Sequence, residues 1–430
     1  MPALPPHNFV VNFFCSFPTE GLNSVSRHAC SRMPRLTKTG LSKRILAGSL
    51  VFATCLSTAL GSADDGQQNK IKSVVDRAVQ PVMLNYSIAG MAVGLTIAGK
   101  SYVFNYGVAS RMPSRPVTDQ TLFELGSISK TFTATLTLYA QASGNLSLAD
   151  KVSKHLSPLD GTRFGEVTLL NLGTHTSGGF PLQLPESIRT EDQLMQYLRI
   201  WRPVYPPGTY RTYANPSIGM LGLITAKSLS GDFDELLEQR VFSPLGMNNT
   251  YISVPKIKMG DYALGYTEEG DPTRAGAGVL SAETFGVKTT AADMLRFIEA
   301  NMNSGAPDET LQRAIIDTHT AYFTAGVMTQ DLIWEQYPYP VDLKTLLEGN
   351  SPGMIFRAVP ATQLTPPEHP REDVWLNKTG STNGFGAYVA FIPVKHLGIV
   401  ILANKSYPID QRVTIAYQIL TQLSSGASAQ

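Results

Sequence analysis

Three groups of polar residues in this chain have the types and spacing needed for nucleophilic catalysis. In the first, Ser127-Ile-Ser-Lys130, a serine precedes a lysine by three residues. On a helix these two side chains lie on one face. A serine hydroxyl is a weak nucleophile until a base takes its proton, and a lysine can serve when burial and nearby cations lower its pKa. The pair predicts a serine nucleophile, provided that residues 127 to about 142 are helical.

The local pattern around this pair favours a different conformation. Residues 131–138 alternate between threonine and apolar side chains, which is typical of a strand. In a strand, positions three apart point to opposite faces, so Ser127 and Lys130 would not meet. The same spacing recurs at Ser253 and Lys256, where Pro255 disfavours a helix interior. The pattern therefore needs partners elsewhere in the chain.

The second group is Tyr213-Ala-Asn215. A tyrosine beside a lysine ammonium can have its phenol pKa lowered, which allows it to act as a general base or acid. The alternative interpretation is structural, because the following Asn-Pro step favours a turn and tyrosine is common in cores.

The third group is Lys378-Thr-Gly-Ser381, which precedes a glycine-rich segment. It would place a cation, a hydroxyl and open backbone along one sheet edge, where a substrate carboxylate could bind and the Ser381 N–H could donate to an oxyanion. Lys38-Thr-Gly40 repeats the tripeptide near the N-terminus without such a setting. The triplet is therefore informative only in its context.

Together, the three groups resemble in order and separation the motifs of the class C serine β-lactamases, the AmpC-type cephalosporinases. The resemblance extends over essentially the whole chain after the first sixty or so residues. It is carried by Phe123-Glu-Leu-Gly-Ser-Ile-Ser-Lys-Thr-Phe132, Leu172-Gly-Thr-His-Thr-Ser-Gly-Gly179, Tyr213-Ala-Asn-Pro-Ser-Ile-Gly219, Pro244-Leu-Gly-Met-Asn-Asn-Thr250 and Leu402-Ala-Asn-Lys405.

This resemblance implies a role for each matching position. Ser127 would be acylated by the β-lactam carbonyl, Lys130 and Tyr213 would share proton transfer, and the resemblance does not say which of the two is the base. The N–H groups of Ser127 and Ser381 would form the oxyanion hole, and water would hydrolyse the acyl-enzyme with Tyr213 assisting. Neither a metal nor a cofactor is implied. The substrate-binding residues would be Gln183, Asn215, Lys378, Thr379, Gly380, Ser381 and Arg412.

Two positions depart from the commonest pattern of the family. Ile409 stands where an asparagine is frequent near the carboxylate end, and Phe285 stands where a loop tyrosine is frequent; both bear on substrate preference. His175 is interpreted as a turn residue. The seven histidines form no His-x-His-x-Asp box, which disfavours a zinc β-lactamase. The chain also lacks the Ser-Asp-Asn box, which disfavours a class A β-lactamase.

The elements that would position these groups predict an α/β fold of the β-lactamase and penicillin-binding-protein type. Its α/β lobe, with an antiparallel sheet, would comprise residues 64–149 and 281–430, and a helical lobe would comprise 150–280, with the site between them. Strands are predicted at 90–97, 101–106, 386–392 and 397–403, and helices at 69–83, 218–227, 233–242 and 410–423. A proline-rich run over 360–370 is predicted to be a surface loop, with a position at the rim of the site as the alternative.

The first 63 of the 430 residues read as a leader with a secretory signal: Lys43 and Arg44 precede an apolar run of roughly fifteen residues and a small-residue exit. All three cysteines lie in this leader, which excludes cysteine chemistry in the remainder. Without the leader's six basic residues and one acidic residue, 29 basic and 33 acidic residues remain, a net charge of −4 that offers no nucleic-acid footprint. We expect a periplasmic monomer, free of the membrane after cleavage.

Three rival hypotheses remain open at this stage. A D-Ala-D-Ala peptidase of the same fold would form the same acyl-enzyme but release β-lactams slowly, and an esterase of this fold would use the same nucleophile. A non-enzymatic penicillin sensor would need a membrane span. The Lys378-Thr-Gly380 group and the setting of Tyr213 favour a β-lactamase over the first two.

Overall fold

The computed structural model describes residues 57–302 and 308–427. The predicted signal segment lies mostly outside these residues. In the described part of the chain, eleven strands form one sheet in which every neighbouring pair is antiparallel. Their order is β3 (Ser114–Pro116), β2 (Lys100–Arg111), β1 (Gly90–Ile97), β15 (Leu397–Ala403), β14 (Gly386–Ile392), β13 (Val374–Ser381), β11 (Glu335–Pro338), β10 (Met328–Gln330), β9 (Ala321–Ala325), β12 (Val359–Glu368) and β5 (Tyr210–Arg211).

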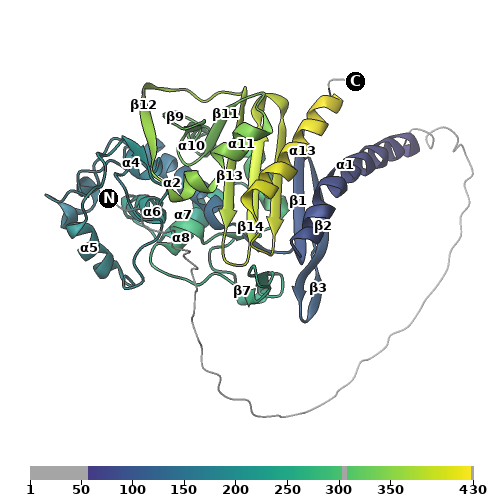
Figure 1. Cartoon of the computed structure of the whole chain (residues 1–430), viewed down its shortest axis with the longest axis horizontal. Coiled ribbons are helices and arrows are strands. Elements are labelled where there is room, and N and C mark those ends of the chain that lie inside the picture. The colour runs from purple at the N-terminus through teal and green to yellow at the C-terminus, as the bar shows by residue number, and fades with distance from the viewer. Residues whose placement is uncertain (1–56, 303–307, 428–430) are drawn as a thin grey trace, which may run out of the picture. The chain divides into compact units, whose positions relative to one another are not determined.

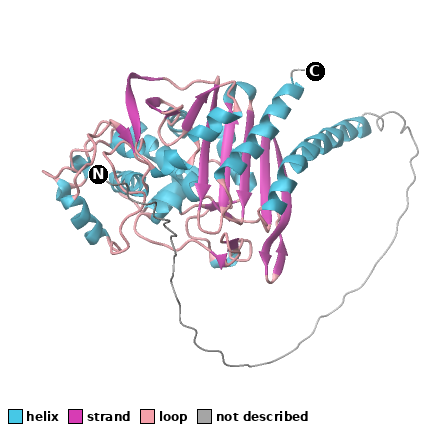
Figure 2. Cartoon of the chain, viewed as in Figure 1, coloured by secondary structure: helices cyan, strands magenta, loops and turns pink. Residues whose placement is uncertain are grey.

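The helices divide between the sheet's two faces and a separate group (Figures 1 and 2). Those that pack on one face are α1 (Ser57–Asn85), α11 (Leu343–Gly349) and α13 (Ile409–Ala427), while α9 (Ala291–Asn301) covers the other. The remaining helices include α2 (Ser129–Ala142), α3 (Val152–His155), α4 (Leu169–Gly173), α5 (Glu191–Ile200), α6 (Asn215–Ser228), α7 (Phe233–Leu237), α8 (Ser281–Phe285), α10 (Glu309–Asp317) and α12 (Pro352–Phe356).

The central strands are buried on both faces. Along β14, Ala387, Val389 and Phe391 face the core beside α9, whereas the alternate residues face the core beside α13. This follows from the period of two in a strand, and it explains why 386–392 and 397–403 are continuously apolar in the sequence. The predicted strands at 90–97, 101–106, 386–392 and 397–403 are confirmed, with β2 beginning one residue earlier and ending five residues later than predicted.

Residues 127–142 are helical, as the catalytic hypothesis requires. A 3₁₀ turn, η1 (Gly126–Ile128), leads directly into α2. The alternating threonines do not make a strand because their hydroxyls are satisfied within the helix: Thr135 and Thr137 donate to the carbonyls four residues back, at 2.9 and 2.8 Å. Residues 129–138 are buried all round, between the core beside α9 and that of the separate helices.

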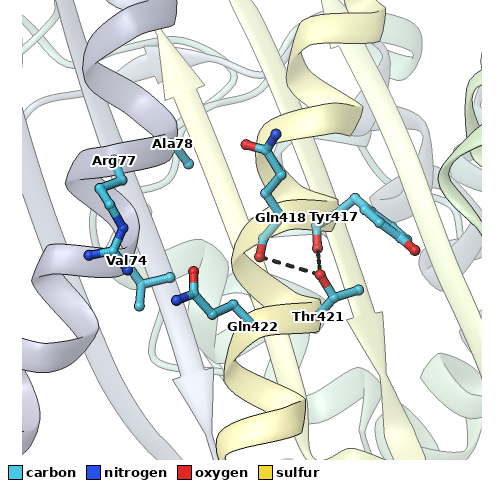
Figure 3. A pocket seen from close by; sticks show the side chains of 7 residues that line it. All are labelled: Val74, Arg77, Ala78, Tyr417, Gln418, Thr421 and Gln422. Carbon is cyan, nitrogen blue, oxygen red and sulfur yellow. Dashed lines mark hydrogen bonds between the residues drawn. The ribbon is translucent and has the colours of Figure 1, made fainter.

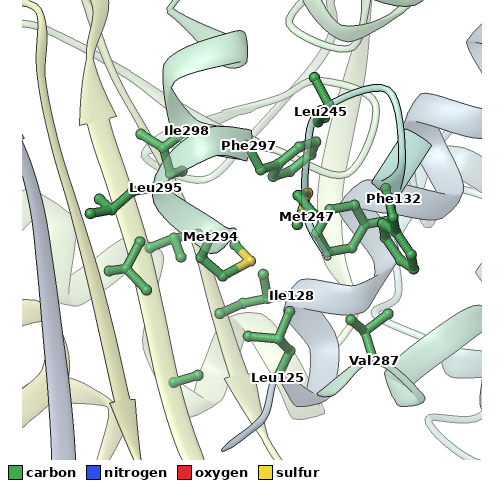
Figure 4. Packing of buried hydrophobic residues seen from close by; sticks show 14 of the residues in the cluster. Leu125, Ile128, Phe132, Leu245, Met247, Val287, Met294, Leu295, Phe297 and Ile298 are labelled. Atoms are coloured by element: carbon green, nitrogen blue, oxygen red, sulfur yellow. The ribbon is translucent and has the colours of Figure 1, made fainter. Parts of the chain in front are cut away.

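Figure 4 shows how this helix is anchored. Ile128 and Phe132 pack beside α9, where Phe132 meets Phe297 with ring centroids 4.3 Å apart and Phe242 at 5.2 Å. Since burying an aromatic side chain of this kind contributes about 2–3 kcal/mol, the contacts fix the start of α2 relative to the sheet. The nucleophile's position is thereby determined by core packing.

One predicted element is wrong. Residues 360–370, expected to form a surface loop, mostly belong to strand β12, which pairs with β9 and, at Val359 and Pro360, with β5. The prolines are accommodated because the pairing with β9 is interrupted between Gln363 and Glu368, so Pro366 and Pro367 need not donate a ladder hydrogen bond.

The predicted helices at 69–83, 218–227 and 410–423 are confirmed within α1, α6 and α13. The helix predicted over 233–242 is α7 continued by a π-helical turn, η3 (Glu238–Phe242). Figure 3 shows a pocket between α1 and α13, lined by Val74, Arg77, Ala78, Tyr417, Gln418, Thr421 and Gln422, none of which is a candidate site residue.

Candidate active site

Ser127 stands at the 3₁₀ turn before α2. Within residues 121–138 it is the one residue that is not fully buried. Gly126, with φ of 54°, turns the chain so that the serine emerges from an otherwise closed core. The fold therefore presents a single hydroxyl from this segment to solvent.

Lys130 lies one turn further along and contacts the serine directly. Its Nζ is 2.8 Å from Ser127 Oγ and donates to the carbonyl of Thr284, in α8, at 3.0 Å. Burial lowers the pKa of Lys130 to about 8; Tyr213 opposes this shift and Lys378 adds to it. At neutral pH an appreciable fraction of Lys130 is thus neutral and able to accept a proton.

Tyr213, in the loop between β5 and α6, lies among three cations. The charged groups of Lys130, Lys378 and Arg211 are 5.4, 5.1 and 5.5 Å from its ring centroid. Burial alone would raise the pKa of the Tyr213 phenol, but Lys130 and Lys378 outweigh it and lower that pKa to about 8. The two lysines act chiefly through space, and the neighbouring Ser127 side chain adds to the lowering.

His175 packs against the same tyrosine, with ring centroids 4.4 Å apart. Its Nδ1 accepts a 3.2 Å hydrogen bond from the Ala214 N–H, and its φ of 59° is that of a tight turn. Burial, reinforced by Arg211, Lys130 and Lys378, holds the pKa of His175 well below its usual range. The imidazole is therefore neutral and adds no charge to the cluster.

The turn that carries Ser127 and the strand end that carries Ser381 come close together because two positions are glycines. A Cβ on Gly126 would lie 2.5 Å from both N and O of Ser381, and one on Gly380 would lie 1.9 Å from the Leu125 carbonyl oxygen. Such distances are impossible for any side chain, so η1 and the end of β13 approach as closely as they do only because both positions lack one. The Lys-Thr-Gly motif needs its glycine for this reason.

Arg412 binds the same end of β13 through hydrogen bonds. It is almost completely buried, and its Nη1 donates to Gly380 O at 2.6 Å and to Ser381 Oγ at 2.7 Å, while Nη2 donates to the carbonyl of Tyr407. Burial lowers the pKa of Arg412 to about 10, so the guanidinium stays charged at neutral pH. The structure thus places this predicted substrate-binding residue against Ser381 within the protein.

The remaining predicted site residues differ in their burial and in their hydrogen bonds. Asn215 begins α6, and its buried Oδ1 has no hydrogen-bond partner among the described residues. The Asn215 N–H donates to Leu182 O at 2.9 Å, which draws in the segment that carries the exposed Gln183. Lys378 and Thr379 are buried on β13.

The two departures from the family pattern also have defined places. Phe285 is half-buried at the end of α8, next to the Thr284 carbonyl that binds Lys130. Ile409 is half-buried at the first position of α13, three residues before Arg412.

Sequence reasoning missed the carboxylate that balances these cations. Glu335 Oε1 is 3.4 Å from Lys378 Nζ and 3.3 Å from Arg211 Nη2, and its Oε2 accepts from Asn377 Nδ2 at 3.1 Å. The available signals were weak: an acidic residue directly after the apolar run Leu332-Ile-Trp334, and a basic residue two positions before Tyr213.

A serine hydroxyl bonded to a buried lysine, with a tyrosine among cations and a sheet edge close to the serine, is an arrangement typical of a serine hydrolase. No group of three or more His, Cys, Asp or Glu side chains in residues 57–302 and 308–427 is placed to hold a metal ion.

The chain belongs to the β-lactamase family, whose model matches residues 75–424. A β-lactamase of Lysobacter lactamgenus is 47% identical over 378 residues, covering 88% of this chain and 98% of that protein. Two solved structures are similar along 82–83% of this chain and 99% of theirs: a D-alanine carboxypeptidase AmpC from Burkholderia cenocepacia (54% identity, TM-score 0.80) and a class C β-lactamase in complex with cefoxitin (49%, 0.81). The resemblance to class C enzymes is confirmed, and the protein is a serine β-lactamase.

Proposed function

We propose that Ser127 is the nucleophile with which this β-lactamase opens β-lactam rings. Its Oγ attacks the ring carbonyl, the carbonyl carbon–nitrogen bond breaks, and the serine proton passes to the departing nitrogen. Water then attacks the ester and restores the free serine. The observation that carries the proposal is the 2.8 Å contact between Ser127 Oγ and Lys130 Nζ, together with the pKa of about 8 to which burial lowers that lysine.

We assign proton transfer to Lys130 and Tyr213 acting together, with Tyr213 assisting the water in deacylation. Their pKa values are both lowered to about 8, and both groups interact with Lys378. Because the two titrations are coupled, the pair has shared apparent pKa values, and either group can be the base in the acylation step.

The substrate contacts follow from the same placement. The N–H groups of Ser127 and Ser381 would receive the carbonyl oxygen, and Lys378 with Thr379 would bind the substrate's carboxylate side. Asn215, with its unpaired Oδ1, and Gln183 would bind the amide of the acyl side chain. In this proposal the α/β lobe (64–149 and 281–430) supplies the nucleophile, and the helical lobe (150–280) supplies Tyr213 and Asn215.

The cellular setting is part of the proposal. Lys43, Arg44 and the apolar run after them support export across the inner membrane with cleavage near Ala63, which would leave a periplasmic monomer. Among the described helices, none has the length and hydrophobicity to cross a bilayer.

The test is kcat/KM for a penicillin, a cephalosporin, a simple aryl ester and a D-Ala-D-Ala peptide. We expect rapid multiple turnover of at least one β-lactam and a loss of several orders of magnitude in Ser127→Ala. Ser253→Ala, at the second Ser-x-x-Lys, is the matched control and should retain full activity. Stoichiometric acylation without turnover would support the D-Ala-D-Ala peptidase, the second candidate, which the Burkholderia neighbour's carboxypeptidase name favours.

A further inference from the structure

Glu335 begins β11, and its side chain is 6% exposed. Its two carboxylate oxygens receive three donors: Lys378 Nζ and Arg211 Nη2 on Oε1, and Asn377 Nδ2 on Oε2. Two of these donors are cations close to the Tyr213 ring, at 5.1 and 5.5 Å from its centroid. A single carboxylate therefore connects two of the three cations around the tyrosine.

This carboxylate is the negative charge of an otherwise positive site. Lys130 Nζ donates to Ser127 Oγ and to the Thr284 carbonyl, neither of which carries a charge. Arg211 otherwise donates to Gln330 Oε1 at 2.7 Å and to Met354 O at 2.7 Å. Among the hydrogen-bond partners recorded for the three cations in the described chain, Glu335 is the one carboxylate.

Buried cations need such a partner. Removing a charged side chain from water costs several kcal/mol unless an opposite charge or several hydrogen bonds compensate. The negative charge of Glu335 compensates the positive charges of Lys378 and Arg211 at once. Asn377, which donates to the carboxylate, is itself held by Tyr388, whose hydroxyl donates to Asn377 Oδ1 at 3.0 Å. The network explains how two cations remain beside a buried phenol.

We propose that Glu335 is a positioning residue for β-lactam hydrolysis: it holds Lys378 and Arg211 beside Tyr213 and thereby sets the pH range in which the enzyme works. The inference rests on the proposed roles of Lys130 and Tyr213. The ionisable groups that face Tyr213 are Lys130 of α2, Arg211 of β5, Lys378 of β13, His175 of the loop after α4 and Glu335 of β11.

The direction of the effect follows from the sign of the charge. The Glu335 carboxylate raises the pKa of Tyr213 and so opposes its ionisation. A negative charge also favours the cationic form of a nearby lysine such as Lys130. Replacing it with a neutral isostere must therefore lower the pKa of Tyr213 and of Lys130, whichever of them is the base. A unit charge lost at this range in a buried site corresponds to a shift of about one pH unit.

The experiment compares pH profiles of kcat/KM for a chromogenic cephalosporin in wild type, Glu335→Gln and Glu335→Asp. We expect the acidic limb to move down by about one pH unit in Glu335→Gln. The acidic limb should stay in place in Glu335→Asp, because this variant keeps the negative charge. The shorter aspartate side chain no longer reaches the cations equally well, so kcat/KM should fall at all pH values. Glu348→Gln, an exposed carboxylate on α11, is the matched control and should change neither. An unshifted limb in Glu335→Gln, with activity uniformly reduced, would overturn the proposal in favour of a purely structural role.

A second measurement separates this inference from the assignment of catalytic roles. The ultraviolet difference between wild type and Tyr213→Phe reports Tyr213 ionisation without turnover, since burial and neighbouring carboxylates raise the pKa of other buried tyrosines such as Tyr337 and Tyr388. A transition near pH 8 that moves down in Glu335→Gln supports the inference even if Tyr213 proves not to be the base. A transition that does not move contradicts the inference while leaving the proposed function intact.

Discussion

Replacement of Gly126 by alanine tests whether the approach of η1 to β13 builds the oxyanion hole. Gly126 has φ of 54°, and a Cβ there would lie 2.5 Å from both N and O of Ser381. Contacts of this kind do not fall below 3.0 Å, so the two backbones must part by at least about 0.5 Å. Catalytic constellations tolerate displacements of about that size at most.

The expected loss is that of one oxyanion-hole donor. Removal of such a donor typically lowers kcat by about 10²–10³, or roughly 3–4 kcal/mol of transition-state stabilisation. The variant also incurs about 1–2 kcal/mol for a Cβ in the left-handed region. The assay is kcat/KM for a cephalosporin together with the free energy of unfolding in urea.

Gly144→Ala separates these two effects. Gly144, after the end of α2, has φ of 75°, but a Cβ there meets nothing within 4 Å. It should therefore lose about 1–2 kcal/mol of stability and keep its activity. Equal loss of activity in the two variants, or full activity in Gly126→Ala, would refute the reasoning.

Four further predictions concern the support of the site and its protonation. Arg412→Lys loses the fork that binds Gly380 O and Ser381 Oγ, so kcat/KM should fall and urea unfolding should show about 1–3 kcal/mol of lost stability; unchanged values would contradict the positioning role. Phe132→Ala should cost about 3–5 kcal/mol by the same measurement, because it opens a cavity between α2 and α9; a cost below 1 kcal/mol would show that α2 is not anchored there. Since the base must be unprotonated and the Lys130 and Tyr213 pKa values are lowered to about 8, wild-type kcat/KM should rise with pH up to about 8, and a flat profile from pH 5 to 9 would exclude both as the base. Dialysis against EDTA should leave turnover unchanged, whereas strong inhibition would indicate a metal enzyme.

The spacing of Ser127 and Lys130 shows what local sequence can predict and what it cannot. Their spacing of three predicts contact on a helix, and the structure confirms both the helix and the contact. The alternating threonines predicted a strand for the same residues. The helix prevails because cores pack against it on all sides and because threonine hydroxyls can bond to carbonyls one turn back.

The prediction of a loop over 360–370 was wrong for a related reason. Proline has no backbone N–H to donate to a neighbouring strand, but whether a hydrogen bond is required at that position depends on how the neighbouring strand pairs. The interrupted pairing between β12 and β9 removes that requirement, and a single chain segment carries no record of it.

The serine, lysine, tyrosine and Lys-Thr-Gly groups, read in their order along the chain, were enough to predict the family of this protein. The charges around Tyr213 could not be predicted in this way. Glu335 and Arg211 are 124 residues apart in the chain, yet Arg211 and Lys378 both donate to the same carboxylate oxygen of Glu335. Charge interactions in a buried site depend on distances of a few ångströms, which only the fold sets. No local pattern could therefore have revealed that a glutamate on β11 contacts two of the cations around Tyr213.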